Sequence, residues 1–221
     1  MSQKTVGFIG LGVMGGAMAG HLRASGEMLL VYTRTKSKVQ MLLDAGAEWR
    51  DSPKQIAQEC DVIFTMVGYP SDVEEIYFGP EGLIENARPG TILVDTTTSR
   101  PDLAVRIYEA AKARGIGALD APVSGGDIGA KNASLTIMVG GDETIFQRAK
   151  PLLEEMGKTV IRQGGPGAGQ HTKMANQIAV AGSLLGAVAD VSDAKNAGLD
   201  VSRILLSSAN GSAQSWPLSH H

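Results

Sequence analysis

Hydrophobic residues in the first half of the chain fall into short runs that alternate with longer amphipathic stretches. The runs have the length of buried strands, and the stretches between them repeat their apolar positions with helical spacing. This alternation predicts an α/β fold, a doubly wound parallel sheet with helices on both faces. The expected strands are Val6–Ile9, Leu29–Tyr32, Val62–Met66, Ile92–Val94, Gly117–Leu119 and Ser134–Val139, and the expected helices are residues 14–24, 35–45, 53–59, 70–77 and 103–114.

The pattern changes in the second half of the chain. Asp142 is placed to cap a helix that runs to about residue 156, and a glycine-rich breaker cluster follows at residues 164–169. Beyond the cluster, residues 171–197 form one long alanine-rich helical pattern without an internal proline. Gly198 is a candidate end for this helix, and a short helix is expected over residues 201–208.

These boundaries predict an α/β domain over residues 1–164 and the beginning of an all-helical domain over residues 165–221. A fragment of two helices leaves its apolar faces without cover. Either the chain is truncated or another subunit supplies the cover, and small residues along the long helix permit close helix approach. We therefore expect a homo-oligomer of the full-length protein.

Composition narrows the class of protein. The chain has 221 residues, 43% hydrophobic and 19% charged, with a net charge of −3, which fits a globular protein and gives no basic surface for nucleic acid. We expect no membrane partner, since no apolar stretch reaches the length of a membrane span and no signal peptide is visible. The single cysteine, Cys60, is expected to be buried, and together these features predict a cytoplasmic protein.

The strongest local motif is a GxGxxG sequence placed between the first expected strand and the first expected helix. That context is typical of a Rossmann-type dinucleotide site, in which glycines allow a tight turn and close approach of the backbone to a pyrophosphate. The N-terminus of the helix then presents free N–H groups to the phosphates. The predicted cofactor contacts in this loop are Gly10, Leu11, Gly12, Val13, Met14 and Gly15.

The choice of cofactor depends on the end of the second expected strand. NAD sites usually carry an acidic residue there, whereas this segment has Thr33, Arg34 and Thr35 and no acid up to Lys38. A guanidinium group and small hydroxyls suit a 2′-phosphate. The segment therefore favours NADP over NAD.

Three segments together resemble the β-hydroxyacid dehydrogenase family, which includes 3-hydroxyisobutyrate dehydrogenase, tartronate semialdehyde reductase and, more distantly, 6-phosphogluconate dehydrogenase. Residues 8–19 are similar to its N-terminal signature, residues 120–126 to its substrate-binding loop and residues 167–177 to its catalytic segment. His21 stands where the family signature usually has Asn. Family members generally continue past residue 221, and a Lys-Asp-Leu segment of that later part is absent from this sequence.

The resemblance identifies Lys173 as the proton-transfer residue, and the chemistry agrees. Hydride transfer from an alcohol needs a base for the hydroxyl proton, and the reverse reaction needs an acid at the same place. A lysine can do both if its pKa is lowered. Asn176 and Gln177 follow at i+3 and i+4, on the same face of the expected helix, and are expected to bind substrate. Asn176-Gln177 also favours small-acid members over 6-phosphogluconate dehydrogenase.

Three further groups of residues receive roles from the family resemblance. Ser124, Gly125 and Gly126 are expected to hold the substrate carboxylate. Thr98 is expected to contact the cofactor near the nicotinamide, although Thr96 and Thr97 beside it leave this choice open. Val67 and Gly68 are expected to line the adenosine side, and no metal site is expected.

Two other functions compete with an NADP-dependent oxidoreductase for small 3-hydroxy acids or their semialdehydes. One is a non-catalytic NADP-binding module that keeps the fold and has lost the chemistry. The other is an imine reductase on the same scaffold, for which Asp or Tyr is expected in place of Lys173.

Overall fold

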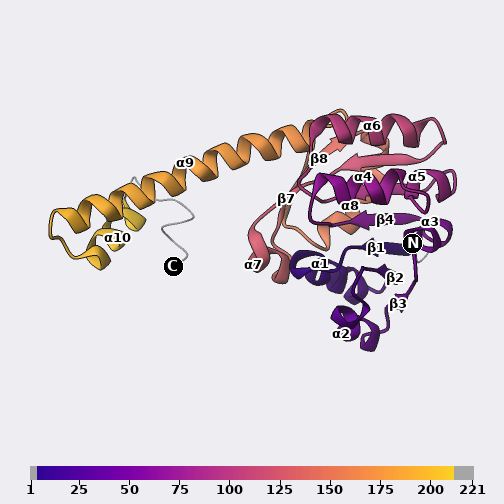
Figure 1. The fold of residues 1–221 in the computed structure, drawn as a ribbon, viewed down its shortest axis with the longest axis horizontal. Helices are drawn as coiled ribbons and strands as arrows, with labels where there is room; N and C mark the ends of the chain where they lie inside the picture. The colour runs from indigo at the N-terminus through magenta and orange to yellow at the C-terminus, as the bar shows by residue number, and fades with distance from the viewer. Residues whose placement is uncertain (1–3, 212–221) are drawn as a thin grey trace. The chain divides into compact units, whose positions relative to one another are not determined.

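The computed structural model describes residues 4–211. The chain forms one compact unit that runs to Lys173 and a second that begins at Met174 (Figure 1). A single long helix, α9, contributes its first turns to the first unit and its remainder to the second.

The first unit is built on one mixed sheet with the strand order β3-β2-β1-β4-β5-β6-β8-β7, and β9 pairs with β8. Strands β1 to β6 pair in parallel in the order 3-2-1-4-5-6 of a Rossmann fold. The strands are β1 (Thr5–Ile9), β2 (Met28–Tyr32), β3 (Glu48–Trp49), β4 (Val62–Thr65), β5 (Ile92–Asp95), β6 (Gly117–Asp120), β7 (Val123–Ser124), β8 (Thr136–Gly141) and β9 (Thr159–Gly164).

Helices cover both faces of this sheet, as the alternating pattern predicts (Figure 1). One core contains buried residues of α1 and α8, and the other contains buried residues of α3, α4, α5 and α6. The helices of the first unit are α1 (Val13–Ala24), the 3₁₀ turn η1 (Lys36–Val39), α2 (Gln40–Asp44), α3 (Pro53–Glu59), α4 (Pro70–Phe78), α5 (Leu83–Asn86), α6 (Pro101–Lys112), α7 (Gly126–Lys131) and α8 (Glu143–Glu154).

The second unit contains most of α9 (Ala168–Asn196) and α10 (Val201–Asn210). Gly198 ends α9 with a φ of +74°, in the left-handed conformation that glycine tolerates. Asp200 then caps α10, where its carboxylate accepts a hydrogen bond from the Ser202 N–H at 2.9 Å. Ser208 donates from its hydroxyl to Asp190 at 2.7 Å and ties the two helices together.

The expected α/β fold is confirmed, and the differences have local causes. Residues 35–45 form a 3₁₀ turn and a short helix instead of one helix. Of the strand expected over residues 134–139, residues 136–139 lie in β8, which pairs antiparallel with β6 and β7, because hydrophobic periodicity does not specify strand direction. Helix α7 was not predicted because glycines weaken helical propensity. It packs against α1, where His21 Nε2 lies 2.9 Å from the Ala130 carbonyl oxygen.

Two expectations about burial and hydropathy have different outcomes. Cys60 is fully buried, as expected, and burial raises the pKa of its thiol to about 12.

The expectation that no stretch is long and apolar enough to cross a membrane is wrong, because one helix meets both criteria of length and composition. Helix α9 has 29 residues and a window with a mean hydropathy of 1.3. Such helices also occur in soluble proteins, so this test alone assigns no membrane.

Candidate active site

The glycine loop between β1 and α1 has a geometry in which each glycine is used differently. Gly10 has a φ of +90°, and a Cβ there would collide with the Met66 carbonyl group. A Cβ on Gly15 would collide with the Gly10 carbonyl group, so helix and strand approach more closely than any other residue would allow. At Gly12 a Cβ would meet nothing within 4 Å, which leaves open space in front of the helix N-terminus.

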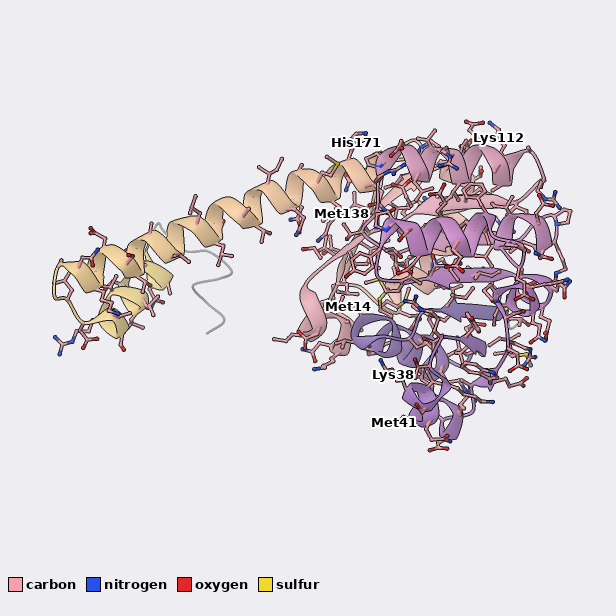
Figure 2. The ribbon with its side chains drawn as sticks, viewed as in Figure 1. Met14, Lys38, Met41, Lys112, Met138 and His171 are labelled. Atoms are coloured by element: carbon pink, nitrogen blue, oxygen red, sulfur yellow. The ribbon has the colours of Figure 1, made fainter. Side chains whose placement is uncertain are left out.

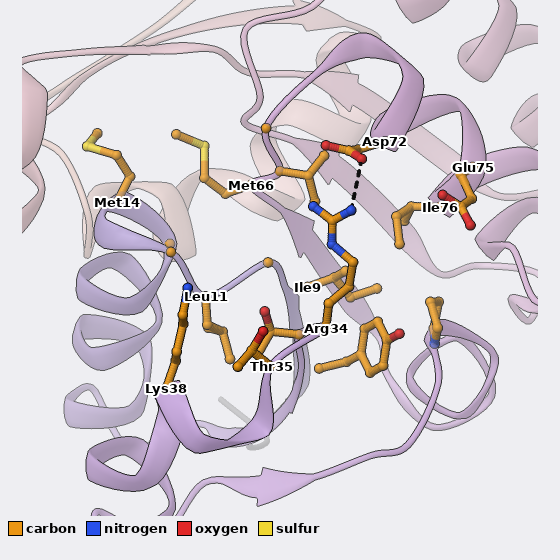
Figure 3. A pocket seen from close by; sticks show the side chains of 18 of the residues that line it. Ile9, Leu11, Met14, Arg34, Thr35, Lys38, Met66, Asp72, Glu75 and Ile76 are labelled. Atoms are coloured by element: carbon orange, nitrogen blue, oxygen red, sulfur yellow. Dashed lines mark hydrogen bonds and ion pairs between the residues drawn. The ribbon is translucent and has the colours of Figure 1, made fainter.

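That open space belongs to a cavity of about 670 Å³, shown from close by in Figure 3. Its volume lies within the usual range for ligand and cofactor sites. Of the predicted cofactor contacts, all line this cavity except Thr98. They are Gly10, Leu11, Gly12, Val13, Met14, Gly15, Thr33, Arg34, Thr35, Val67 and Gly68.

One end of the cavity carries positive charge next to a carboxylate. Arg34 and Lys38 line it, and the Arg34 side chain is 78% exposed and forms an ion pair with Asp72 (Figure 3). Arg34 Nη1 lies 3.3 Å from Asp72 Oδ1. The second oxygen of Asp72 accepts a hydrogen bond from the Tyr69 N–H at 3.1 Å, which fixes the carboxylate at the start of α4. Both cations and carboxylates therefore line this part of the cavity.

Buried polar residues, Thr65, Asp95 and Thr97, gather at the carboxyl ends of β4 and β5, and we call this cluster the polar floor. Asp95 Oδ1 accepts hydrogen bonds from the Thr65 hydroxyl at 2.8 Å and from the Thr97 N–H at 3.1 Å. The Thr97 hydroxyl in turn accepts from the Val67 N–H at 3.1 Å. Burial raises the pKa of Asp95 to about 6. Thr98, which follows this floor, is exposed and lies outside the residues that line the cavity.

The start of α9 is joined to this floor by side-chain hydrogen bonds. The buried carboxylate of Asp120, at the end of β6, accepts from the N–H groups of Gly167 and Gln170, each at 2.8 Å. Gln170 is fully buried, and its side-chain amide group contacts the loop after β5. His171, labelled in Figure 2, is exposed.

Lys173 lies in the last turn of α9 that belongs to the first unit. Its side chain is buried, with 8% exposed, and among residues 4–211 it has no hydrogen-bond or ion-pair partner. Burial lowers the pKa of its ammonium group. A buried lysine without a carboxylate partner is the arrangement that moves a lysine toward acid–base chemistry near neutral pH.

The predicted substrate residues lie outside the cavity. Ser124 is half-buried at the end of β7, and Gly125 and Gly126 have φ values of +129° and +63° at the start of α7. In the second unit, Asn176 is half-buried and Gln177 is exposed. The side-chain oxygen of Asn176 is buried, and within the described chain it has no hydrogen-bond partner.

Sequence reasoning missed Lys38, Asp72, Asp120 and Gln170. Asp72 lines the cavity but lies outside the sequence motifs, and Lys38, Asp120 and Gln170 lie inside them without a predicted role. Two signals were available. Asp120 directly follows the predicted strand at residues 117–119, where α/β sheets place functional side chains, and Gln170 lies three residues before Lys173.

Residues 5–165 match the family described as the NAD binding domain of 6-phosphogluconate dehydrogenase. The chain is 53% identical over 218 residues to an uncharacterized oxidoreductase, YkwC, of Bacillus subtilis (strain 168), covering 99% of this chain and 76% of the relative. It is 40% identical over 216 residues to the 2-hydroxy-3-oxopropionate reductase of Escherichia coli (strain K12), covering 98% of this chain and 74% of the relative.

A solved structure agrees with these relatives. The Mycobacterium tuberculosis 3-hydroxyisobutyrate dehydrogenase with L-serine superposes with a TM-score of 0.89 at 30% identity, covering 99% of this chain and 74% of that structure. The chain belongs to the β-hydroxyacid dehydrogenase family.

As a β-hydroxyacid dehydrogenase family member, the chain spans about three quarters of the length of the relatives described above. Family membership confirms the resemblance that the three sequence motifs indicate, and it makes the chain an NAD(P)-dependent oxidoreductase.

Proposed function

We propose that this β-hydroxyacid dehydrogenase transfers a hydride between NADP(H) and a small 3-hydroxy acid or its semialdehyde, with Lys173 as general acid and base. The observation that supports it most is a buried lysine that has no ion-pair partner among residues 4–211, in a chain that also has a cavity at its glycine loop. Substrates of the 3-hydroxyisobutyrate or tartronate semialdehyde type are the first to test, given the names of the relatives.

The bound nicotinamide supplies or accepts the hydride. In the oxidation direction, Lys173 in its neutral form takes the hydroxyl proton as the C–H hydride leaves the carbinol carbon, and the C–O bond becomes a carbonyl. In the reduction direction, protonated Lys173 returns that proton to the carbonyl oxygen. Burial lowers the pKa of Lys173, which increases the neutral fraction at a given pH and also makes the protonated form a stronger acid.

We propose that two groups bind the substrate itself. Ser124, Gly125 and Gly126 present one hydroxyl and backbone N–H groups, which can hold a carboxylate without bulk. Asn176 and Gln177 supply amide donors and acceptors from the helix that carries Lys173. The buried, unpartnered oxygen of Asn176 supports this proposal, because a buried acceptor without a donor is costly unless a ligand supplies one.

The preference for NADP over NAD rests on the segment that follows β2. Arg34 and Lys38 are cations of this segment, Thr33 and Thr35 add hydroxyls beside them, and the acids of the cavity, Asp72, Glu75 and Glu81, lie outside the segment. We propose that Arg34 and the two threonines hold the 2′-phosphate, with Lys38 as an additional cation, and that Thr98 contacts the cofactor near the nicotinamide.

The assembly and location of the protein are also proposals. Along α9, Met174, Ile178, Leu184, Leu185 and Val188 are at least half exposed, and we propose that a second copy covers them in a homo-oligomer of the full-length protein. The protein is proposed to be cytoplasmic. Light scattering tests the first point, and flotation with lipid vesicles tests the membrane alternative: a monomer that floats with vesicles contradicts both.

The test of the function is titration of NADPH and of NADH by fluorescence, followed by turnover with tartronate semialdehyde and with 3-hydroxyisobutyrate. We expect NADPH to bind at micromolar concentration, NADH to bind at least about 10-fold more weakly, and one substrate to turn over. Binding of neither cofactor contradicts the oxidoreductase function. Binding of NADPH without turnover of any small hydroxy acid or semialdehyde favours a non-catalytic module.

A further inference from the structure

The first turn of α9 is anchored to the sheet by a single carboxylate. Asp120 Oδ1 accepts a hydrogen bond from the Gly167 N–H at 2.8 Å, and Asp120 Oδ2 accepts from the Gln170 N–H at 2.8 Å. These N–H groups lie 47 and 50 residues from Asp120 along the chain. The carboxylate therefore fixes where the helix begins relative to β6.

The packing around this carboxylate leaves no room for the helix to move closer. A Cβ on Gly140 would collide with the Asp120 carboxylate, and a Cβ on Gly169 would collide with the Met138 carbonyl oxygen. Both glycines allow the backbone of α9 to lie directly against β6 and β8. Close-packed backbone of this kind permits little adjustment.

Gln170 joins the same turn to the loop after β5. Its side-chain Nε2 donates to the Thr97 carbonyl oxygen at 2.8 Å, and its Oε1 accepts from the Ser99 N–H at 2.8 Å. Gln170 is 0% exposed; its hydrogen bond to Thr97 is buried and its hydrogen bond from Ser99 is partly buried. The two hydrogen bonds involve residues 97 and 99, on either side of Thr98, which is the predicted nicotinamide contact.

Lys173 follows Gln170 by three residues, so the two side chains project from nearly the same face of α9. A shift of this turn would carry Lys173 with it. Conversely, a turn that is fixed to residues 97–99 holds Lys173 at a constant distance from the loop that is proposed to contact the cofactor.

We propose that Gln170 and Asp120 are positioning residues, which hold the Lys173 ammonium group at a fixed position relative to the loop that contains Thr98. The proposal rests on the proposed acid–base function of Lys173. It concerns the placement of Lys173 and assigns neither Gln170 nor Asp120 a contact with substrate.

The experiment replaces Gln170 with Met and with Ala. Methionine keeps most of the buried volume and makes neither hydrogen bond, so it separates bonding from packing. Gln147→Met is the matched control, because Gln147 lies on the exposed surface of α8 and bonds only to Glu143 in its own helix. For each variant, NADPH affinity, kcat and KM are measured.

A further readout does not depend on turnover. The pKa of Lys173 is measured from the pH dependence of its acetylation by trace acetic anhydride, read by mass spectrometry. In Gln170→Met we expect kcat to fall at least about 10-fold with NADPH affinity within about 3-fold of wild type, and the pKa of Lys173 to rise toward its ordinary value as water reaches the loosened turn. The control is expected to leave all of these quantities unchanged.

Each outcome has a distinct meaning. If Gln170→Met keeps both the kcat and the Lys173 labelling profile of wild type, the positioning role is overturned, and loss of activity in Gln170→Ala alone then reflects packing. If wild type has no turnover, the proposed function fails, while the labelling profile still tests the positioning role. If Gln170→Met does not fold, Asp120→Asn is labelled instead, and an unchanged pKa of Lys173 overturns the proposal.

Discussion

The N-termini of α1 and α9 are built in opposite ways. At α1, Gly12 occupies the N-cap without a side-chain hydrogen bond, the first turn has no acidic residue, and open space lies in front of it. At α9, the buried carboxylate of Asp120 accepts hydrogen bonds from the N–H groups of Gly167 and Gln170. Free N–H groups and the positive end of the helix dipole attract an anion.

The two N-termini differ in which groups are left for a ligand. The donors of α1 are left for a ligand, so its backbone is the functional group and the side chains of the loop need only be small. At the start of α9 the N–H groups of Gly167 and Gln170 are satisfied by Asp120, so the N-terminus of that helix serves as an anchor for the turn that carries Lys173. The N-terminus of α1 is therefore suited to bind an anion, and the N-terminus of α9 is fixed to the sheet by Asp120.

The largest expected effect concerns Lys173, on the helix whose first turn Asp120 anchors. Lys173→Ala removes the proposed proton carrier, and we expect turnover to fall by at least about 10²-fold, the usual scale for a general acid–base residue. NADPH affinity, measured by fluorescence, should stay within about 3-fold of wild type because Lys173 does not line the cavity. Lys150→Ala, on the surface of α8 where Lys150 pairs with Glu154, is the matched control. Full activity of Lys173→Ala contradicts the assignment.

The next effect comes from making the N-terminus of α1 resemble that of α9. Gly12→Asp places a carboxylate at the N-terminus of α1, as Asp120 does at α9, and should repel the pyrophosphate. Like charges brought together in a closed site cost several kcal/mol, so we expect NADPH to bind at least about 30-fold more weakly. The melting temperature should change little, since a Cβ at Gly12 meets nothing within 4 Å.

Gly12→Asn is the control for the effect of size, because it has the same shape without the charge. Equal loss of affinity in Gly12→Asp and Gly12→Asn would show that bulk, and not charge, excludes the cofactor. Gly15→Val is the opposite case: a Cβ there collides with the Gly10 carbonyl group, so we expect a lower melting temperature as well as weaker binding.

A smaller effect concerns Arg34, a cation that lines the cavity after β2. Hydrogen bonds to a charged group are worth about 1.5–3 kcal/mol, so Arg34→Ala should weaken NADPH binding about 10-fold or more and NADH binding less than about 2-fold. Asp72→Asn removes the carboxylate 3.3 Å from Arg34 and should strengthen NADPH binding by a few-fold. Titration of both cofactors into both variants measures this selectivity. Equal losses of NADPH and NADH in Arg34→Ala would contradict a 2′-phosphate contact.

The smallest effect concerns stability and pH. Burial raises the pKa of Asp95 to about 6, so the folded protein binds this proton more tightly than the unfolded chain does. Stability from this group is therefore highest below the ordinary pKa of aspartate and falls as pH rises toward 6. Asp95→Asn keeps an oxygen to accept from Thr65 and Thr97 and removes the buried charge.

We expect Asp95→Asn to match wild type near pH 4 and to exceed its free energy of unfolding by about 1–3 kcal/mol at pH 7, the size of a shift of this order. Urea unfolding at both pH values measures the difference. A constant difference between the two pH values would show that Asp95 does not titrate in this range.

Much of the fold could be predicted because its signals are local. The helix at residues 53–59 matches α3 because Ser52 caps it and Pro53 begins it, and both preferences depend on adjacent residues. Asp142 is the N-cap of α8 as expected, although its carboxylate accepts from the Tyr108 hydroxyl at 3.0 Å instead of capping the helix. Strand β9 was missed because its half-exposed residues alternate without a strong apolar run.

The alternation of strands and helices and the glycine loop of the cavity could be read from the amino-acid pattern, because they follow from hydrophobic spacing and backbone sterics over a few residues. The hydrogen bonds of Asp120 and Gln170, which span 47 to 73 residues, depend on the folded chain, and so does the burial of Lys173 with no partner among the described residues. The pKa of a lysine depends on which groups fold around it, and no local pattern records that environment.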